Sequence, residues 1–451
     1  MSGVEVITLG CRLNFAESEA MRGLAGGEDD LIIVNSCAVT NEAVRQTRQA
    51  IRKAKRARPD ARVFVTGCAA QVEPERFAAM PEVSRVLGNR EKFQSSSFQR
   101  KLESPFSSGV EGKEIPAFAG MTEDDAEIRV SDIMAVRETA PHLATGFAER
   151  ARAFVEVQNG CDHRCTFCII PYGRGNSRSV PAGLVVDRIK ALVDDGFREV
   201  VLTGVDVTSY GPDLPGSPTL GMLIERILKH VPDLPRLRLS SLDCIEMDER
   251  LFDLATGEAR FMPHLHMSFQ AGDDMVLKRM KRRHSRADAV DTVARLKAMR
   301  PEIAIGADMI AGFPTETDEM AENSLRLIEE CDVVMGHIFP FSPKHGTPAA
   351  LMPQVPPQIA KTRARRLREA CARQRSAWLD GLVGTRQKVL VEKDGYGHAE
   401  NFAPAQLRHS SESWNPTSLG QRDSSFRWND GEVVEVEVTA VENGTLIGAS
   451  A

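Results

Sequence analysis

Three short strand-like runs near the N-terminus are each followed within three residues by a cysteine, and this pattern constrains the fold more than any other feature. The runs, at residues 4–9, 31–34 and 62–66, alternate with helix-like stretches. Strands alternating with helices predict a parallel sheet, whose strands all end at one shared edge. The three cysteines, Cys11, Cys37 and Cys68, are therefore expected to converge there as one site.

Strand and helix signals alternate again through the middle of the chain. Six such units predict an incomplete (β/α)6 barrel, whose chemistry belongs at the carboxyl ends of its strands. Toward the C-terminus, residues 388–392 and 433–440 alternate apolar and polar side chains, which predicts a small all-β barrel. The barrel strands are expected at residues 154–157, 200–203, 237–240, 264–268, 303–310 and 333–339.

The predicted fold class is α/β, with three domains. An N-terminal parallel-sheet domain covers residues 1–92, the barrel covers 146–378 and the all-β module covers 379–451. Residues 91–125 and 408–430 have no sustained period and resemble peptides encoded by mobile palindromic DNA. We interpret 93–145 as insertion and linker. The second insertion lies inside the all-β module, which survives only if the insertion extends a loop and displaces no strand.

The composition is that of a soluble protein. No apolar run approaches the roughly 18 residues needed to cross a bilayer, and the first residues lack the basic segment of a secretory signal. We therefore expect a cytoplasmic protein with no membrane association. Thiols stay reduced in the cytosol, so the nine cysteines predict metal ligands, nucleophiles or buried apolar groups. The net charge of −6 argues against a protein that coats nucleic acid indiscriminately.

A second group of cysteines, Cys161, Cys165 and Cys168, forms a C-x3-C-x2-C loop after the strand at 154–157. Three thiolates on one loop can hold three irons of a [4Fe–4S] cluster and leave the fourth iron open. An open iron can chelate S-adenosylmethionine (SAM), and an electron passed to its sulfonium releases a 5′-deoxyadenosyl radical. The alternative is a zinc loop, with His163 or a distant residue as the fourth ligand.

Four motifs together resemble the radical SAM methylthiotransferases over nearly the whole chain. The cysteine loop continues as Ile-Ile-Pro-Tyr-Gly-Arg-Gly at 169–175, and residues 8–14, 35–40 and 66–71 are similar to the family's auxiliary-cluster domain. His-Ile-Phe-Pro-Phe-Ser-Pro at 337–343 and the residues around Cys11 and Cys37 most resemble the branch that modifies threonylcarbamoyladenosine in tRNA.

This resemblance implies two [4Fe–4S] clusters and two SAM molecules per turnover. The loop cysteines would carry the cluster that generates the radical, which takes hydrogen from C2 of the adenine. The N-terminal cysteines would carry the cluster that holds or supplies sulfur at its open iron, and the second SAM would give the methyl group. The implied product is 2-methylthio-N6-threonylcarbamoyladenosine, beside the anticodon of tRNA.

Polar and small residues at the predicted strand ends are expected to line the SAM pocket, since glycine lets a ligand approach the backbone closely. A plain turn or capping role is the alternative for each. These residues are Thr203, Gly204, Asp206, Ser240, Gln270, Asp308 and Gly312. His264 and His266 are expected to be core or hydrogen-bonded histidines, and Cys244, Cys331 and Cys371 to be structural.

Basic runs at 45–56, 278–286 and 361–375 could meet tRNA phosphates, although such runs are usually only solvated helix faces. The C-terminal module resembles the TRAM domain, which implies RNA recognition by shape and phosphate with the target base splayed out. We also expect a reductase or flavodoxin-type electron donor, and a monomer.

Other functions remain open. Within the family, isopentenyladenosine in tRNA is the next substrate, and a ribosomal-protein aspartate is the third. From another class, the chain could be an inactive RNA-binding relic whose insertions have spoiled the fold.

Overall fold

The computed structural model describes residues 3–98, 126–137, 151–408 and 430–450, which fall into two compact units. Unit 1 contains the described residues up to Arg137 together with Ile169–Asn176. Unit 2 contains the remaining described residues, up to the C-terminal barrel. The chain therefore leaves unit 1, enters unit 2, returns to unit 1 for one short segment and ends in unit 2.

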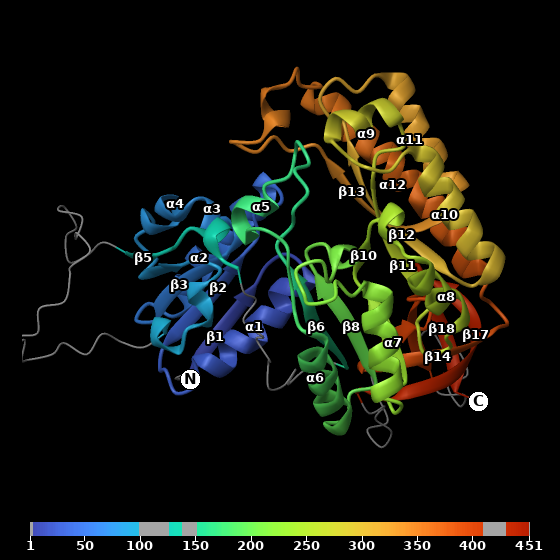
Figure 1. Cartoon of the computed structure of the whole chain (residues 1–451), viewed down its shortest axis with the longest axis horizontal. Helices are drawn as coiled ribbons and strands as arrows, with labels where there is room; N and C mark the ends of the chain where they lie inside the picture. Colours follow the sequence, from blue (N-terminus) through green and yellow to red (C-terminus); the bar gives the residue numbers. More distant parts are fainter. Residues whose placement is uncertain (1–2, 99–125, 138–150, 409–429, 451) are drawn as a thin grey trace, which may run out of the picture. The chain divides into compact units, whose positions relative to one another are not determined.

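Unit 1 is built on a five-stranded parallel sheet whose strands lie in chain order (Figure 1). The strands are β1 (Val4–Thr8), β2 (Leu31–Ser36), β3 (Arg62–Gly67), β4 (Arg85–Leu87) and β5 (Glu127–Arg129). The helices are α1 (Arg12–Leu24), α2 (Asn41–Ala57), α3 (Cys68–Val72), α4 (Pro74–Ala78) and α5 (Ile170–Arg174). The 3-10 turns are η1 (Glu91–Phe93), η2 (Ser95–Ser97) and η3 (Ile133–Ala135).

The apolar pattern explains this layering. Every residue of β2 is buried, as expected for a parallel strand covered on both faces. Helix α2 buries only one stripe, formed by Val44, Thr47, Ile51 and Ala54 at helical spacing, and leaves its basic face in solvent. The stripe packs against the same core as the strands, so hydrophobic burial fixes which way the helix faces.

The first part of unit 2 is the predicted incomplete barrel. Its six long strands run parallel in two sheets, β7-β6-β8-β9 and β10-β11-β12-β13, with β9 next to β11. The strands are β6 (Arg152–Asn159), β7 (Arg178–Ser179), β8 (Glu199–Gly204), β9 (Arg236–Leu239), β10 (Ser241–Leu242), β11 (His264–Gln270), β12 (Ala304–Ala311) and β13 (Val333–Pro340).

Helices follow the barrel strands, and the last and longest of them packs on β13 before the chain enters the final module. They are α6 (Ala182–Asp194), α7 (Leu220–His230), α8 (Glu249–Gly257), α9 (Asp274–Met280), α10 (Arg286–Met299), α11 (Asp318–Glu330) and α12 (Pro357–Asp380). The 3-10 turns are η4 (Val207–Ser209), η5 (Cys244–Glu246) and η6 (Pro348–Leu351).

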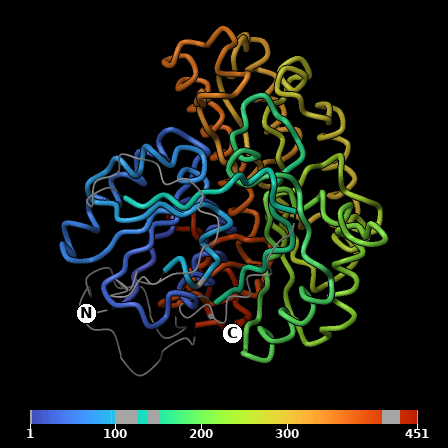
Figure 2. The backbone as a smooth tube through the Cα atoms, turned by 60° about the vertical axis from the view of Figure 1, so that its left-hand side comes forward, coloured from blue at the N-terminus to red at the C-terminus, as the bar shows by residue number. Residues whose placement is uncertain are grey.

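The C-terminal module is a closed five-stranded barrel, traced in red in Figure 2. Its strands are β14 (Arg386–Lys393), β15 (Tyr396–Ala399), β16 (Pro404–Arg408), β17 (Val433–Glu442) and β18 (Thr445–Ser450). Most of the expected insertion at 408–430 lies outside the described residues. Strand β16 ends at its first residue, Arg408, β17 begins after it, and both pair within the closed barrel.

Buried charge fastens this module to the amino ends of the large barrel's strands. Glu199, at the start of β8, is fully buried and pairs with Arg152, Arg236 and Arg238. Arg238 also donates to the carbonyl of Glu400 at 3.1 Å. Burial alone would raise the pKa of Glu199, but the arginine charges lower that pKa well below its usual range. The cluster therefore holds a carboxylate between the two barrels.

The predicted fold class is confirmed, including the parallel N-terminal sheet, the incomplete barrel and the all-β C-terminal module. The segment expected to be insertion and linker also contains β5, which pairs with β4. Most of the insertion at 91–125 lies outside the described residues, and the domain bounds stay a prediction. Within the described ranges, no helix is both long enough and apolar enough to span a membrane.

Candidate functional site

In unit 1, the three N-terminal cysteines follow β1, β2 and β3 at the shared edge of the sheet. Cys11 precedes α1 and is exposed, whereas Cys37 and Cys68 are buried. Gly10 has φ +101°, and a Cβ built on it would lie 2.8 Å from Cβ of Cys37. Burial and the nearby charge of Cys68 raise the pKa of Cys37 to about 12. The topology thus gathers these thiols into one site.

A buried polar network surrounds this site. Asn14 on α1 donates to the carbonyls of Leu9 at 2.6 Å and Ser36 at 3.2 Å, and so ties the first two cysteine loops together. The side chain of Asn35 donates to the carbonyl of Asn14 at 3.0 Å. These bonds join the segments that carry Cys11 and Cys37.

Arg174 of α5 reaches the same site from a distant part of the sequence. It is 2% exposed, and its Nε donates to Sγ of Cys68 at 3.1 Å. One terminal nitrogen donates to Asn14 at 2.6 Å and to Glu17 at 2.9 Å, while the other also pairs with Glu17. Lys92, which is fully buried, contacts Glu17 from Nζ at 2.7 Å. A guanidinium, an ammonium and a carboxylate are therefore enclosed beside Cys68.

The donor set of this site fits an iron–sulfur cluster. Three thiol sulfurs are soft ligands of the kind that select iron–sulfur centres or zinc. Such a cluster bound through thiolates is an anion, and the enclosed guanidinium offers it both a hydrogen bond and compensating charge.

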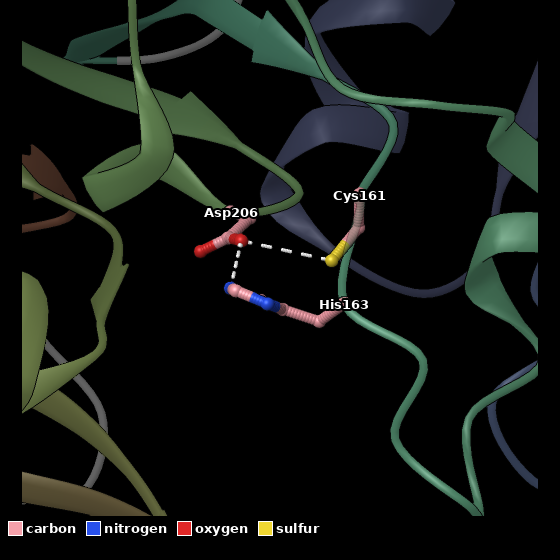
Figure 3. A group of neighbouring side chains, drawn as sticks. All are labelled: Cys161, His163 and Asp206. Atoms are coloured by element: carbon pink, nitrogen blue, oxygen red, sulfur yellow. Dashed lines mark hydrogen bonds and ion pairs between the residues drawn. The ribbon is translucent and has the colours of Figure 1, made fainter. Parts of the chain in front are cut away.

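In unit 2, the C-x3-C-x2-C loop follows β6, with all three cysteines partly exposed. Sγ of Cys161 lies 3.6 Å from Oδ2 of Asp206, and Nε2 of His163 lies 2.9 Å from the same oxygen (Figure 3). Hydrogen bonds to Asp206 and Glu246 raise the pKa of His163 to about 10. Burial and the charge of Asp206 raise the pKa of Cys161 above its usual range. A thiol facing a carboxylate favours a cation between them, which fits a metal-binding loop.

His163, the fourth ligand of the alternative zinc site, turns its Nε2 to Asp206 and Glu246. A cavity of about 470 Å³ opens beside these side chains. Its lining includes Ser209 and Arg283, so it presents both hydroxyl and charged groups next to the loop. That volume is in the range of small-molecule sites.

A buried arginine also approaches this loop. Nη1 of Arg282 lies 3.8 Å from Sγ of Cys165, and its Nη2 donates to Asp243 at 2.8 Å and to the carbonyl of Ser268 at 3.0 Å. Arg282 therefore has neither of the roles considered for the run at 278–286, which were contact with RNA phosphates and a solvated helix face. Its side chain is 9% exposed because Asp243 and the strand end draw it inward.

The residues expected to bind SAM lie at or near the carboxyl ends of the barrel strands. Thr203 and Gly204 end β8, Ser240 follows β9, and Gln270 ends β11 with φ +64°. Among the described residues, no hydrogen-bond partner reaches Oγ of buried Ser240. Contact of these residues with SAM stays a prediction.

Asp308 and Gly312 have partners within the protein. Asp308 on β12 lies 3.1 Å from Nε2 of His266 and 3.3 Å from Nδ1 of His337. These histidines hold the pKa of Asp308 below its usual range, although burial alone would raise it. Gly312 has φ +71°, and a Cβ there would lie 2.3 Å from Cβ of Ala360, so backbone packing already requires glycine.

The remaining sequence candidates are structural in the described residues. His264 is buried and stacks on Phe402 at 4.9 Å, and Cys244, Cys331 and Cys371 are buried. Arg363, in the basic run at 361–375, is 8% exposed and pairs with Glu316 and Asp318 rather than facing solvent.

Sequence reasoning gave no role to Arg174, Glu17 or Lys92. One signal was present for Glu17: it shares the buried face of α1 with Leu13 and Met21, where an acidic residue is costly unless it is paired. No local pattern indicates that Arg174, 157 positions later, supplies the partner.

Comparisons with known proteins found matches in both units of the chain. Residues 155–328 match the Radical SAM superfamily, and residues 3–88 match the uncharacterized protein family UPF0004. The chain is 50% identical to the threonylcarbamoyladenosine tRNA methylthiotransferase MtaB of Rickettsia prowazekii, over 89% of this chain and 91% of that one. It is 34% identical to the enzyme of the same name from Aquifex aeolicus, with 88% and 94% covered.

A relative named for a different substrate is less similar to this chain than the Rickettsia prowazekii enzyme is. The tRNA-2-methylthio-N(6)-dimethylallyladenosine synthase of Erythrobacter litoralis is 33% identical, with 86% of each chain covered. Among solved structures, the radical S-adenosylmethionine methyltransferase TsrM of Kitasatospora setae has a TM-score of 0.52 at 17% identity. That match covers 74% of this chain and 68% of the other, and it shows likeness of fold alone.

Proposed function

Because this chain belongs to the radical SAM methylthiotransferase family, we propose that it converts N6-threonylcarbamoyladenosine in tRNA, beside the anticodon, into its 2-methylthio derivative. The observation that carries the proposal is the 50% identity, over 89% of the chain, to a relative named for this substrate. The relative named for dimethylallyladenosine is 33% identical, which makes that nucleoside the second candidate.

The two cysteine triplets would hold the cofactors. Cys161, Cys165 and Cys168 would bind one [4Fe–4S] cluster, and the three N-terminal cysteines would bind the other. With two SAM molecules per turnover, these groups supply a 5′-deoxyadenosyl radical, a sulfur atom and a methyl group. The protein's own side chains would orient the cysteine loop. Asp206 contacts both Cys161 and His163 of the loop, and the buried Arg282 contacts Cys165.

The C-terminal barrel would contact tRNA, since small β-barrels of this kind bind nucleic acid through shape and phosphate. Glu199 and its arginines join this small barrel to the incomplete (β/α)6 barrel. RNA bound to the small barrel would therefore be held in a fixed position relative to the cysteine loop. We further propose a cytoplasmic monomer that receives electrons from a reductase or flavodoxin-type donor.

The test is mass spectrometry of tRNA nucleosides from a bacterial host that lacks this modification, with and without the gene. A new 2-methylthio-N6-threonylcarbamoyladenosine peak is expected. A 2-methylthio-isopentenyladenosine peak instead would move the assignment to the second candidate. No new nucleoside, despite soluble protein carrying iron and sulfide, would contradict the proposal and favour an inactive RNA-binding relic.

A further inference from the structure

Each cysteine triplet includes one sulfur that is approached by a buried arginine. Arg174 reaches Cys68 at 3.1 Å in unit 1, and Arg282 reaches Cys165 at 3.8 Å in unit 2. In both cases a buried carboxylate holds the arginine, Glu17 for the first and Asp243 for the second. The bond to Cys68 is the shorter of the two, and its surroundings are the more enclosed.

The geometry around Arg174 leaves the guanidinium little freedom. Its two terminal nitrogens are used by Glu17 and Asn14, and Nε faces the sulfur of Cys68. A planar guanidinium can make these three contacts at once because its donors lie in a fixed fork, which an ammonium group lacks.

The net charge of the buried side chains beside Cys68 is positive, which favours binding of an anion there. Arg174, Lys92 and Glu17 are at most 2% exposed, and two cations with one carboxylate leave one positive charge enclosed. Burying charge in this way is costly and does not by itself stabilise a fold. A cluster bound to three thiolates carries negative charge, so it would balance the excess at the sulfur that Arg174 contacts.

We propose that Arg174 is a positioning residue for the N-terminal cluster. Its Nε–H bond holds the Cys68 thiolate and raises the reduction potential of that cluster, while Glu17 and Asn14 keep the guanidinium in place. This inference rests on the proposed function, since it assumes an iron–sulfur cluster on Cys11, Cys37 and Cys68. Hydrogen bonds to the sulfurs and local charge are established determinants of cluster potential.

The test uses the full chain with Cys161, Cys165 and Cys168 replaced by alanine, so that only the N-terminal cluster remains. A redox titration followed by electron paramagnetic resonance gives its midpoint potential. Arg174→Gln should shift the midpoint to lower potential, because both the positive charge and the bond to sulfur are lost. Arg174→Lys keeps the positive charge but loses the planar set of donors of the guanidinium. The midpoint potential of this variant should therefore shift in the same direction but by less.

Arg282→Gln, made in the same background, is the matched control and should leave the midpoint unchanged. A second measurement is made on the protein with Arg174 in place. With ¹⁵N-labelled arginine, the reduced cluster should show a ¹⁵N coupling from Nε, and Arg174→Lys should abolish it.

The outcomes separate the two claims. Iron absent from the N-terminal cysteines would overturn the proposed function and this inference together. A cluster that is present, shows no ¹⁵N coupling and keeps its midpoint in Arg174→Gln would overturn the role of Arg174 alone. If Arg174→Gln does not fold, the labelled protein with Arg174 in place still decides the question.

Discussion

At the scale of single residues, Gly10 shows how a missing side chain shapes the N-terminal site. Its φ of +101° and its closeness to Cys37 mean that the loop bearing Cys11 can lie against the loop bearing Cys37 only if residue 10 has no Cβ. A φ in this region costs a residue other than glycine about 1–3 kcal/mol, and the collision adds to that cost.

Gly10→Ala should therefore lower the iron content of the purified protein by about half, through loss of one of two clusters. Iron and sulfide analysis measures this effect. Gly27→Ala is the matched control, because Gly27 also has a positive φ, of +95°, but no atom lies within 4 Å of a Cβ built there. Equal iron loss in both variants would show that backbone strain, and not the contact with Cys37, is responsible.

Lys92 offers a second test at this scale. Lys92→Met removes one of the two cations beside Glu17, whose pKa lies below its usual range because the charges of Arg174 and Lys92 outweigh the effect of burial. Arg174 still pairs with Glu17 in this variant, so the loss in the free energy of unfolding should be that of one charge-assisted hydrogen bond, about 1.5–3 kcal/mol. Urea unfolding at pH 7 measures the loss. Lys53→Met, at an exposed position of α2, should change stability little, and an equal loss there would refute the argument.

At the scale of elements, the join between the two barrels of unit 2 depends on one carboxylate. Glu199 lies between the arginines of β6 and β9, and these also contact β14 and the turn after β15. Glu199→Gln would leave the buried arginines without a full counter-charge, so we expect destabilisation of about 3–5 kcal/mol. Limited proteolysis should release the C-terminal barrel sooner in this variant.

The same carboxylate predicts an acid dependence of stability. Because the pKa of Glu199 is depressed in the folded state, its contribution is complete above its unfolded value, near 4.5, and is lost as pH falls toward the folded value. The melting temperature of the wild type should fall in this acidic range. The melting temperature of Glu199→Gln should depend less on pH. Glu435→Gln, in a solvent-exposed pair with Arg386, is the control, and it should melt like the wild type at each pH.

Elements also show what the sequence could and could not predict. The long apolar strands were recognisable because burial on both faces leaves continuous apolar runs, as in β2. The three-residue strands β4 and β5 were not, since such short segments have no measurable period. In the sequence, helix α5 directly continues the cysteine loop, and no local sequence pattern indicates that it packs in unit 1.

The same limit applied to the candidate sites. Cysteines placed after strands indicate ligands because topology alone brings the strand ends together. The arginines that contact Cys68 and Cys165 depend on pairing between residues more than a hundred positions apart, and no periodicity records that pairing. Arg282 was even assigned to a surface, because a run of basic residues does not show which of its members turns inward.

At the scale of the whole molecule, the two cysteine sites should divide the reaction between them. Replacement of Cys11, Cys37 and Cys68 by alanine should leave SAM cleavage intact and abolish the methylthio product. Replacement of the loop cysteines should abolish both, because under the proposed function the radical would originate at the cluster they hold. Release of 5′-deoxyadenosine and nucleoside analysis measure the two steps. Loss of SAM cleavage in the first variant, with the barrel folded, would contradict this division.

The return of residues 169–176 to unit 1 limits how such a chain can be recombined. A fragment that ends at Arg137 would contain Cys68 and Glu17 but lack the arginine that contacts both. A chimaera that exchanged only the N-terminal part between relatives would pair one parent's carboxylate with the other parent's arginine. Functional hybrids should therefore carry 169–176 from the same parent as the N-terminal sheet.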